Sequence, residues 1–341
     1  MKRLALTLSA LAALALPAAD AGAWGNSGHR MVGVAAMQSL PEDLPAFLRT
    51  AAAAAEVGEL SREPDRWKGG GRTHDRDRDT AHFIDLDDSG RVMSEAGPLV
   101  TELPELRSEY ERQLTQAGLD VDDAGYLPYA LIDGYQQIVR DFGYWRVLNA
   151  LEARATDPAR RAWYREDRER REALLLRDIG ELSHYVGDGA QPLHLTIHYN
   201  GWGDYPNPEG FTMSRQFHGQ VDSWPFGRID VTSVVGATAE PSICASPCAI
   251  RERVPVYIQS SLALVPALYR LEQSGSLAVG DETSRQFMLS RLAAGASELR
   301  DLVASAWRDS ADARVGWPAV RVSEVENGTI ADPWDSLFGA D

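Results

Sequence analysis

The chain has 341 residues, of which 44% are hydrophobic and 25% are charged. That apolar content is too high for a disordered chain and is sufficient to bury a core. The net charge of -16 argues against a partner held mainly by a basic surface, such as the nucleic acid of a histone-like protein. Acidity does not exclude a phosphate ester as substrate, because bound metal ions can supply local positive charge.

The first 23 residues have the organisation of a secretory signal peptide. Lys2 and Arg3 precede an apolar stretch over residues 4–18, and residues 21–23 form an A-x-A cleavage site. The stretch is shorter than the roughly 20 residues that a membrane-spanning helix needs. We expect a mature chain that starts at Trp24, lies in the periplasm or outside the cell, and has no membrane anchor. An uncleaved N-terminal anchor is the alternative.

The mature chain, residues 24–341, is predicted to be all-α and to form a single, mainly helical domain. Apolar residues recur at three- and four-residue spacing, few runs alternate as strands do, and nothing in the composition marks a domain boundary. The predicted helices cover residues 42–57, 99–117, 127–152, 156–187, 250–273 and 281–308. Irregular regions are expected at 61–80 and 199–249.

Two charged segments are interpreted as solvated surfaces. The run from Arg72 to Asp79 alternates in sign, which is more typical of a self-paired surface than of a phosphate-binding loop. Arginines between residues 159 and 177 are interleaved with acidic residues at helical spacing, so we expect them on the outer face of a long helix.

The chain has two cysteines, Cys244 and Cys248. Because export leads to an oxidising compartment, we expect a disulfide that closes this small loop. A metal site built on the two thiolates is the alternative, but no second pair of ligands lies nearby.

The seven histidines carry the most information about function. His184 and Asp188 are four residues apart, so on a helix both project from one face within reach of a common ion. His218 and Asp222 repeat this spacing, and His194 lies between the two pairs. The pattern predicts a metal site, with histidines scattered through core and surface as the alternative.

Three further candidate ligands precede these pairs: His29, Asp65 and His82. Nitrogen and oxygen ligands without thiolates favour zinc over manganese or iron. Export is compatible with zinc, since no thiolate has to be kept reduced.

These residues resemble the single-strand-specific zinc nucleases, the S-one/P-one nuclease family. The resemblance rests on motifs that occur in order between residues 24 and 222: Trp24-Gly-Asn-Ser-Gly-His29, His82-Phe-Ile-Asp85, His184-Tyr-Val-Gly-Asp188, Gln-Pro-Leu-His194 and His218-x-x-x-Asp222. The rest of the chain carries no motif but is compatible with that family's helical fold. This fold is shared with zinc-dependent phospholipase C, and long irregular loops surround its trinuclear zinc site.

The resemblance implies three zinc ions. The ligands of the first would be Asp65, His82 and His184. The ligands of the second would be His29 and the amino group and carbonyl of Trp24, with Asp188 bridging the two ions. The ligands of the third would be His194, His218 and Asp222. Because the amino group of Trp24 is free only after signal cleavage, activity would be coupled to export.

The resemblance also implies the reaction. RNA, single-stranded DNA and 3'-nucleotides would be the substrates, hydrolysed to 5'-phosphate products or stripped of the 3'-phosphate. Zinc-bound hydroxide would attack phosphorus. Lys68 would stabilise transition-state charge beside the ligands Asp65 and Asp188, although it could be an ordinary surface lysine. No stable protein partner is implied.

Substrate selectivity would depend on Phe83 and Asp85, which in this family stack on the base and hydrogen-bond its edge. Ordinary core packing is the alternative for Phe83. The chain departs from the family over residues 195–208, where His198 is a rival ligand that we interpret as a loop residue. It departs again at Gln216-Phe217, where we expect an effect on packing.

Two other functions are compatible with the ligand pattern. Zinc-dependent phospholipase C shares the Trp-started zinc cluster, but its ligand set usually ends with Glu, where this chain has Asp222. A secreted zinc-binding protein without catalysis would instead have a closed four-ligand site, whereas a catalytic site keeps an open position.

Overall fold

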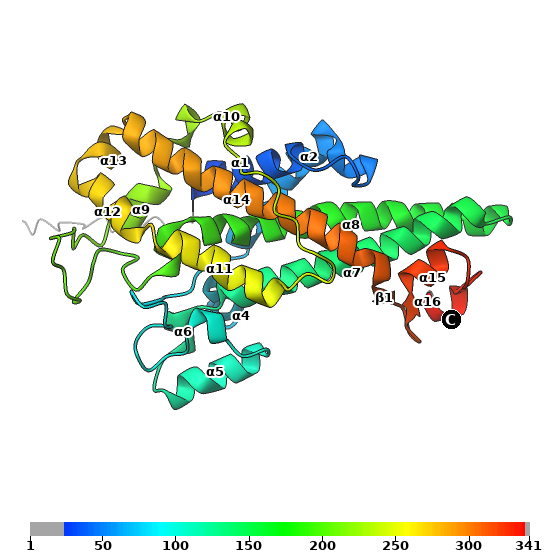
Figure 1. Ribbon diagram of the computed structural model, residues 1–341, viewed down its shortest axis with the longest axis horizontal. Helices are drawn as coiled ribbons and strands as arrows, with labels where there is room; N and C mark the ends of the chain where they lie inside the picture. Colours follow the sequence, from blue (N-terminus) through cyan, green and yellow to red (C-terminus); the bar gives the residue numbers. More distant parts are fainter. Residues whose placement is uncertain (1–23, 338–341) are drawn as a thin grey trace, which may run out of the picture.

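The computed structural model describes residues 24–337, so the predicted signal peptide lies outside the described residues. Two long helices, α7 (Leu127–Arg154) and α8 (Pro158–Ala190), form a hairpin through the middle of the molecule (Figure 1). A third, α14 (Glu282–Asp309), packs across both, and α1 (Gly25–Gln38) packs against α14, α8 and α2 (Ala51–Leu60). The prediction of a mainly helical protein is confirmed.

The remaining elements are shorter helices, 3-10 turns and one pair of strands, which pack around the long helices. The α-helices are α3 (Glu63–Arg66), α4 (Arg72–Asp79), α5 (Arg107–Gln116), α6 (Val121–Ala124), α9 (Phe217–Asp222), α10 (Val231–Gly236), α11 (Ile250–Leu262), α12 (Val265–Gln273), α13 (Ser276–Val279), α15 (Val322–Glu326) and α16 (Trp334–Leu337). The 3-10 turns are η1 (Ala46–Arg49), η2 (Thr80–His82), η3 (Val100–Glu102), η4 (Pro192–Leu195), η5 (Phe226–Arg228) and η6 (Ser310–Asp312). Strands β1 (Arg314–Val315) and β2 (Val320–Arg321) pair antiparallel.

The two halves of α8 differ in character. At its start, Asp157 caps the helix by accepting a hydrogen bond from the backbone N–H of Arg160, and Pro158 occupies the first turn, where no N–H is needed. Most of the arginines that follow form ion pairs on the outer face of the helix, as predicted; Arg168, for example, contacts Glu152 at 2.8 Å. The last turns are instead buried, so α8 carries His184 and Asp188 into the interior.

Several predicted boundaries are wrong. Residues 25–38 form α1, where no helix was predicted. The regions expected to be irregular also contain helices, α3 and α4 within 61–80 and α9 and α10 within 199–249. The predicted helix 250–273 divides into α11 and α12, with a proline in the first turn of α12. The helices expected from residues 42 and 99 begin later, after Pro45 and Pro104, because proline disfavours helix in the residue before it.

The core consists of one large apolar cluster between the long helices and a smaller one around Leu148, Tyr164 and Val315, near the C-terminal helices α15 and α16. Cys244 and Cys248 form the predicted disulfide. Among residues 24–337, no helix is both long and apolar enough to cross a membrane.

Candidate metal centre

The predicted ligands come from widely separated parts of the chain and converge at the buried end of α8. His29 is on α1, Asp65 on α3, His82 at the end of η2, and His194 on η4, while α9 carries His218 and Asp222. The residues form three groups, in each of which one nitrogen or oxygen per side chain lies within 4.8 Å of the others. These groups are His29–Asp65–His184, His82–His184–Asp188 and His194–His218–Asp222.

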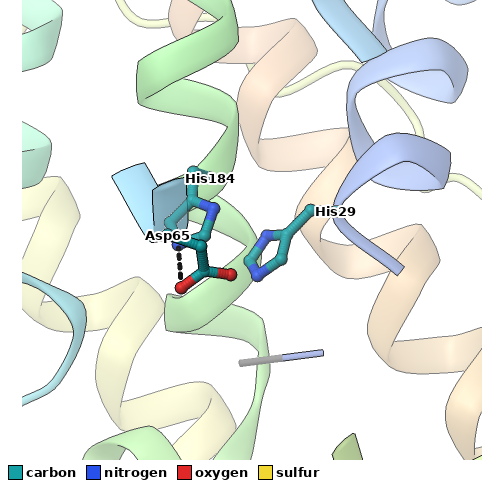
Figure 2. A group of neighbouring side chains, drawn as sticks. All are labelled: His29, Asp65 and His184. Carbon is teal, nitrogen blue, oxygen red and sulfur yellow. Dashed lines mark ion pairs between the residues drawn. The ribbon is translucent and has the colours of Figure 1, made fainter. Parts of the chain in front are cut away.

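The first group is shown in Figure 2. The rings of His29 and His184 are stacked with their centroids 3.8 Å apart, and Asp65 Oδ1 lies 3.8 Å from His184 Nε2. Gly187, one turn of α8 beyond His184, makes room for His29, because a Cβ there would be 2.7 Å from His29 Nδ1. A glycine at this position therefore allows α1 to bring its histidine against α8.

The second group surrounds Asp188, which has no exposed surface. Its Oδ2 lies 3.1 Å from His82 Nδ1 and 3.4 Å from His184 Nε2. Its Oδ1 lies 3.6 Å from His29 Nε2 and 3.4 Å from His194 Nδ1. One carboxylate thus touches histidines of all three groups, which is the position expected of a bridging ligand.

The predicted trio Asp65, His82 and His184 is also brought together. Asp65 Oδ1 is 4.0 Å from His82 Nδ1 and 3.8 Å from His184 Nε2, and the two imidazole nitrogens are 2.9 Å apart. His184 donates from Nδ1 to the carbonyl of Ser61 at 2.7 Å, so its Nε2 carries the lone pair in the neutral ring. Fixing a ligand histidine through its other nitrogen is usual at metal sites.

The third group matches its predicted members. His194 donates from Nδ1 to the carbonyl of His82 at 2.8 Å, and its Nε2 faces His218 Nε2 at 3.1 Å. His218 Nε2 also lies 3.1 Å from Asp222 Oδ2. Two imidazole nitrogens and a carboxylate oxygen therefore point at one another, an arrangement that calls for a shared proton or cation.

Trp24 is buried beside the third group. Its indole donates to the carbonyl of Gly187 at 2.6 Å, and its backbone nitrogen lies 3.3 Å from Asp222 Oδ1. The atom that cleavage before Trp24 would convert into an amino group is thus already at the centre. The backbone carbonyl of Trp24 accepts a hydrogen bond from the N–H of Gly28, in the first turn of α1, at 3.3 Å.

The protein leaves several polar atoms of this centre without hydrogen bonds. Both ring nitrogens of His29 and Nε2 of His82 are buried and have no hydrogen-bond partner among the described residues. Leaving such atoms unpaired costs free energy unless something else binds them. A cluster of metal ions would use these atoms.

Burial sets the protonation of the centre. It lowers the pKa of His184 to about 3 and of His194 to about 4, and lowers the pKa values of His29 and His82 well below the ordinary value. Neutral imidazole is the form that binds metal ions. Burial, and next the nearby charge of Asp65, raise the pKa of Asp188 well above its usual range. A bound cation would oppose that shift.

The predicted catalytic and substrate-binding residues adjoin the centre. The ammonium of Lys68 lies 2.8 Å from Asp65 Oδ1, with about a quarter of its side chain exposed. Phe83 is half-buried and Asp85 is buried, and burial raises the pKa of Asp85 well above its usual range. The backbone of Ile84, between them, donates to the carbonyl of His194 at 2.9 Å, which places this segment against the third group.

The remaining two histidines lie outside the three groups. Both ring nitrogens of His198 have partners, the carbonyl of Trp202 at 2.7 Å and Asp88 at 3.3 Å, and its ring stacks on Trp202. This agrees with its interpretation as a loop residue. His74 is exposed on α4 beside Asp75.

Sequence reasoning missed two residues that orient ligands. Gln191 is fully buried and donates to Asp222 Oδ1 at 3.0 Å, while Ser61 supplies the carbonyl that fixes His184. In the sequence, Gln191 is part of the motif Gln-Pro-Leu-His194. Its position between the ligands Asp188 and His194 was the available signal for a role at the centre.

Comparisons with known proteins give no relative for this chain: no family model matches it, and no curated protein or solved structure is significantly similar.

Proposed function

We propose that the chain is a zinc-dependent phosphodiesterase that hydrolyses RNA and single-stranded DNA to 5'-phosphate products and also acts on 3'-nucleotides. One observation carries the proposal: nine residues from widely separated parts of the chain meet in a largely buried space where carboxylates, imidazoles and a backbone nitrogen face one another. The resemblance of the motifs to the S-one/P-one nucleases supplies the reaction class.

The donor set fits zinc. All side-chain donors are imidazole nitrogens or carboxylate oxygens, which zinc accepts in tetrahedral sites. The unpaired nitrogens of His29 and His82 supply lone pairs that no hydrogen bond uses. We assign the three ions to the ligands predicted from the sequence, with Asp188 shared between the first two. When bound, zinc supplies the positive charge that activates water and neutralises phosphate oxygens.

The chain's own residues have distinct roles in this proposal. Ser61, Gln191 and the carbonyl of His82 hold ligand side chains in fixed orientations. Lys68 neutralises Asp65 in the absence of substrate and turns to the phosphate when substrate binds, which its partial exposure allows. Phe83 offers a half-buried aromatic face to a base, and an unpaired, unstacked base is needed for such stacking.

The N-terminus provides a test that is specific to this centre. Two forms of the protein would be compared, one that starts at Trp24 and one that retains Ala23 as an additional residue. The mature form is expected to bind one more zinc per chain and to hydrolyse single-stranded DNA faster, because only its Trp24 nitrogen is an amine. Equal zinc content and equal rates in the two forms would contradict the assignment of Trp24 as a ligand.

A further inference from the structure

A groove between α11 and α14 is a second feature of the molecule that the proposed function does not use. Its volume is about 990 Å³, at the upper end of the range for small-molecule sites. Residues of α11 and α14, whose positions are shown in Figure 1, line the groove, and the segment 237–249, which we call the strap, borders it. None of its lining residues belongs to the candidate metal centre.

The strap is held in place by a regular set of hydrogen bonds. Backbone N–H groups of Ala239, Ser242, Cys244 and Cys248 donate to side chains spaced four residues apart on α14, namely Ser297, Asp301, Ser305 and Asp309. The disulfide closes the end of the strap next to α11. This border of the groove is therefore built by specific contacts.

Arg291 is the unusual residue of the groove. It is half-buried, burial lowers its pKa, and no carboxylate pairs with it among residues 24–337. Its only hydrogen bond there is a long one, 3.4 Å from Nε to Ser290 Oγ. The other arginine of the groove, Arg253, is fully paired, with Glu298 at 2.7 Å and Asp301 at 3.5 Å.

The other polar groups of the lining are mostly occupied. Ser260, Ser290 and Ser297 each donate to a backbone carbonyl, and the hydroxyl of Tyr257 donates to the carbonyl of Val186 at 2.7 Å. Between them the walls are apolar and built of small or branched side chains, including Val256, Leu289, Ala293 and Ala294. A ligand would therefore find an apolar surface with one available cation.

We propose that this groove binds a monoanionic amphiphile, a carboxylate or similar anion on a short hydrocarbon body, with the anion on Arg291. The guanidinium fork matches a carboxylate in two parallel hydrogen bonds, and partial burial strengthens that pair. A polyanion fits poorly, because Glu240 and Glu252 at the rim would repel its further charges. The site is independent of the proposed nuclease activity.

Calorimetric titration of the zinc-loaded protein with octanoate tests this site. Acetate, which lacks the hydrocarbon body, and 1-octanol, which lacks the negative charge, serve as comparison probes. We expect octanoate to bind with a stoichiometry near one, and acetate and 1-octanol to bind at least about tenfold more weakly. Arg291→Gln should weaken octanoate binding about tenfold or more and leave 1-octanol binding unchanged. Ala294→Phe, which fills the groove, should weaken both.

Arg285→Gln is the matched control, because Arg285 is on the same helix but pairs with Glu282 and does not line the groove. Circular dichroism melting shows whether each variant is folded. Unchanged octanoate affinity in Arg291→Gln, or no saturable binding by the parent protein, would overturn the proposal. Octanoate that binds at the metal centre instead would be recognised by its loss in zinc-free protein, and would overturn it equally.

Discussion

Two regions of this protein bury charged groups, and they balance the charge in different ways. Under the strap, Arg253 and Arg300 neutralise Glu298 and Asp301, with Arg300 Nε 2.8 Å from Asp301. At the candidate metal centre, the carboxylates of Asp65, Asp188 and Asp222 have one ammonium nearby, that of Lys68 on Asp65, and burial lowers the pKa values of four surrounding histidines, which keeps them neutral.

The two regions differ in whether their charges are balanced by the protein's own residues. The Arg253 cluster balances its charges with its own residues, so its contribution is to the stability of the fold. The metal centre combines three carboxylates and one nearby ammonium with unpaired lone pairs, and a bound cation would relieve the cost of burying them. Burial alone does not distinguish the two regions; the balance of charges does.

The largest expected effect is that of Asp188→Asn. Removing the shared carboxylate should lower zinc content and reduce hydrolysis of single-stranded DNA by about a thousandfold or more, because the metal supplies several kcal/mol of transition-state stabilisation. Asp178→Asn, on the same helix outside the centre, is the control and should retain activity. Full activity in Asp188→Asn would contradict the assignment of Asp188 as a shared metal ligand.

Arg253→Leu tests the charge-balanced cluster under the strap. It leaves Glu298 buried without its cation and Asp301 with Arg300 alone, so the free energy of unfolding should fall by about 3–5 kcal/mol while zinc content per folded chain stays unchanged. Urea denaturation and metal analysis measure the two quantities. Arg285→Leu, which removes an exposed ion pair, should cost about 1 kcal/mol or less. Equal losses in the two variants would show that the Arg253 cluster is not special.

Removing zinc tests the candidate metal centre. Ligands that bind only the folded state stabilise it, so chelation should lower the melting temperature by about 5–10 °C. The fall should be reversed by added zinc and should be smaller in Asp188→Asn, which has already lost the carboxylate shared by the first two ions. A melting temperature that does not respond to chelation in the parent protein would mean that the unpaired atoms are tolerated without metal.

Phe83→Ala sharpens the account of substrate binding. Loss of base stacking, worth about 1–3 kcal/mol, should raise KM for single-stranded DNA about tenfold and leave hydrolysis of a minimal phosphodiester unchanged. Steady-state kinetics on both substrates measure this. Equal losses on the two substrates would remove base stacking from the role of Phe83.

A pH-dependent effect concerns Asp178, which lies against Asp141 and near Glu181. Burial raises its pKa from 3.8 to about 7, so the folded state binds this proton more tightly than the unfolded state. Tighter binding of this proton by the folded state contributes to the free energy of unfolding. This contribution is fully present below about pH 4 and is lost as the pH rises through about 7. Zinc-free Asp178→Asn should therefore match the parent near pH 4 and melt at a higher temperature at pH 8. A difference in melting temperature that is the same at both values would contradict this.

The long helices and most of the centre could be predicted from the sequence. The periodic pattern located α7, α8 and α14, and the i, i+4 spacing of His184 and Asp188 placed both on one helix face, where they are found. Such signals are local, and the histidines are few, so their joint occurrence was informative. The small loop disulfide was predictable for the same reason.

What the sequence could not provide was long-range geometry. The first half of α1 is glycine-rich and has low intrinsic helix propensity, and packing against α14, α8 and α2 stabilises it. The donation from Gln191 to Asp222 and the contact between His29 and His184 depend on how separate elements meet. The groove beside Arg291 is likewise visible only once α11, α14 and the strap are placed.

The most direct test of the central claim is the zinc content of the mature protein, measured together with the release of 5'-nucleotides from single-stranded DNA and RNA. The account predicts close to three zinc ions per chain and nuclease activity that is lost on chelation and restored by zinc. Three zinc ions with activity only on phosphatidylcholine would assign the centre to phospholipid hydrolysis instead. A protein that binds no zinc would contradict the account.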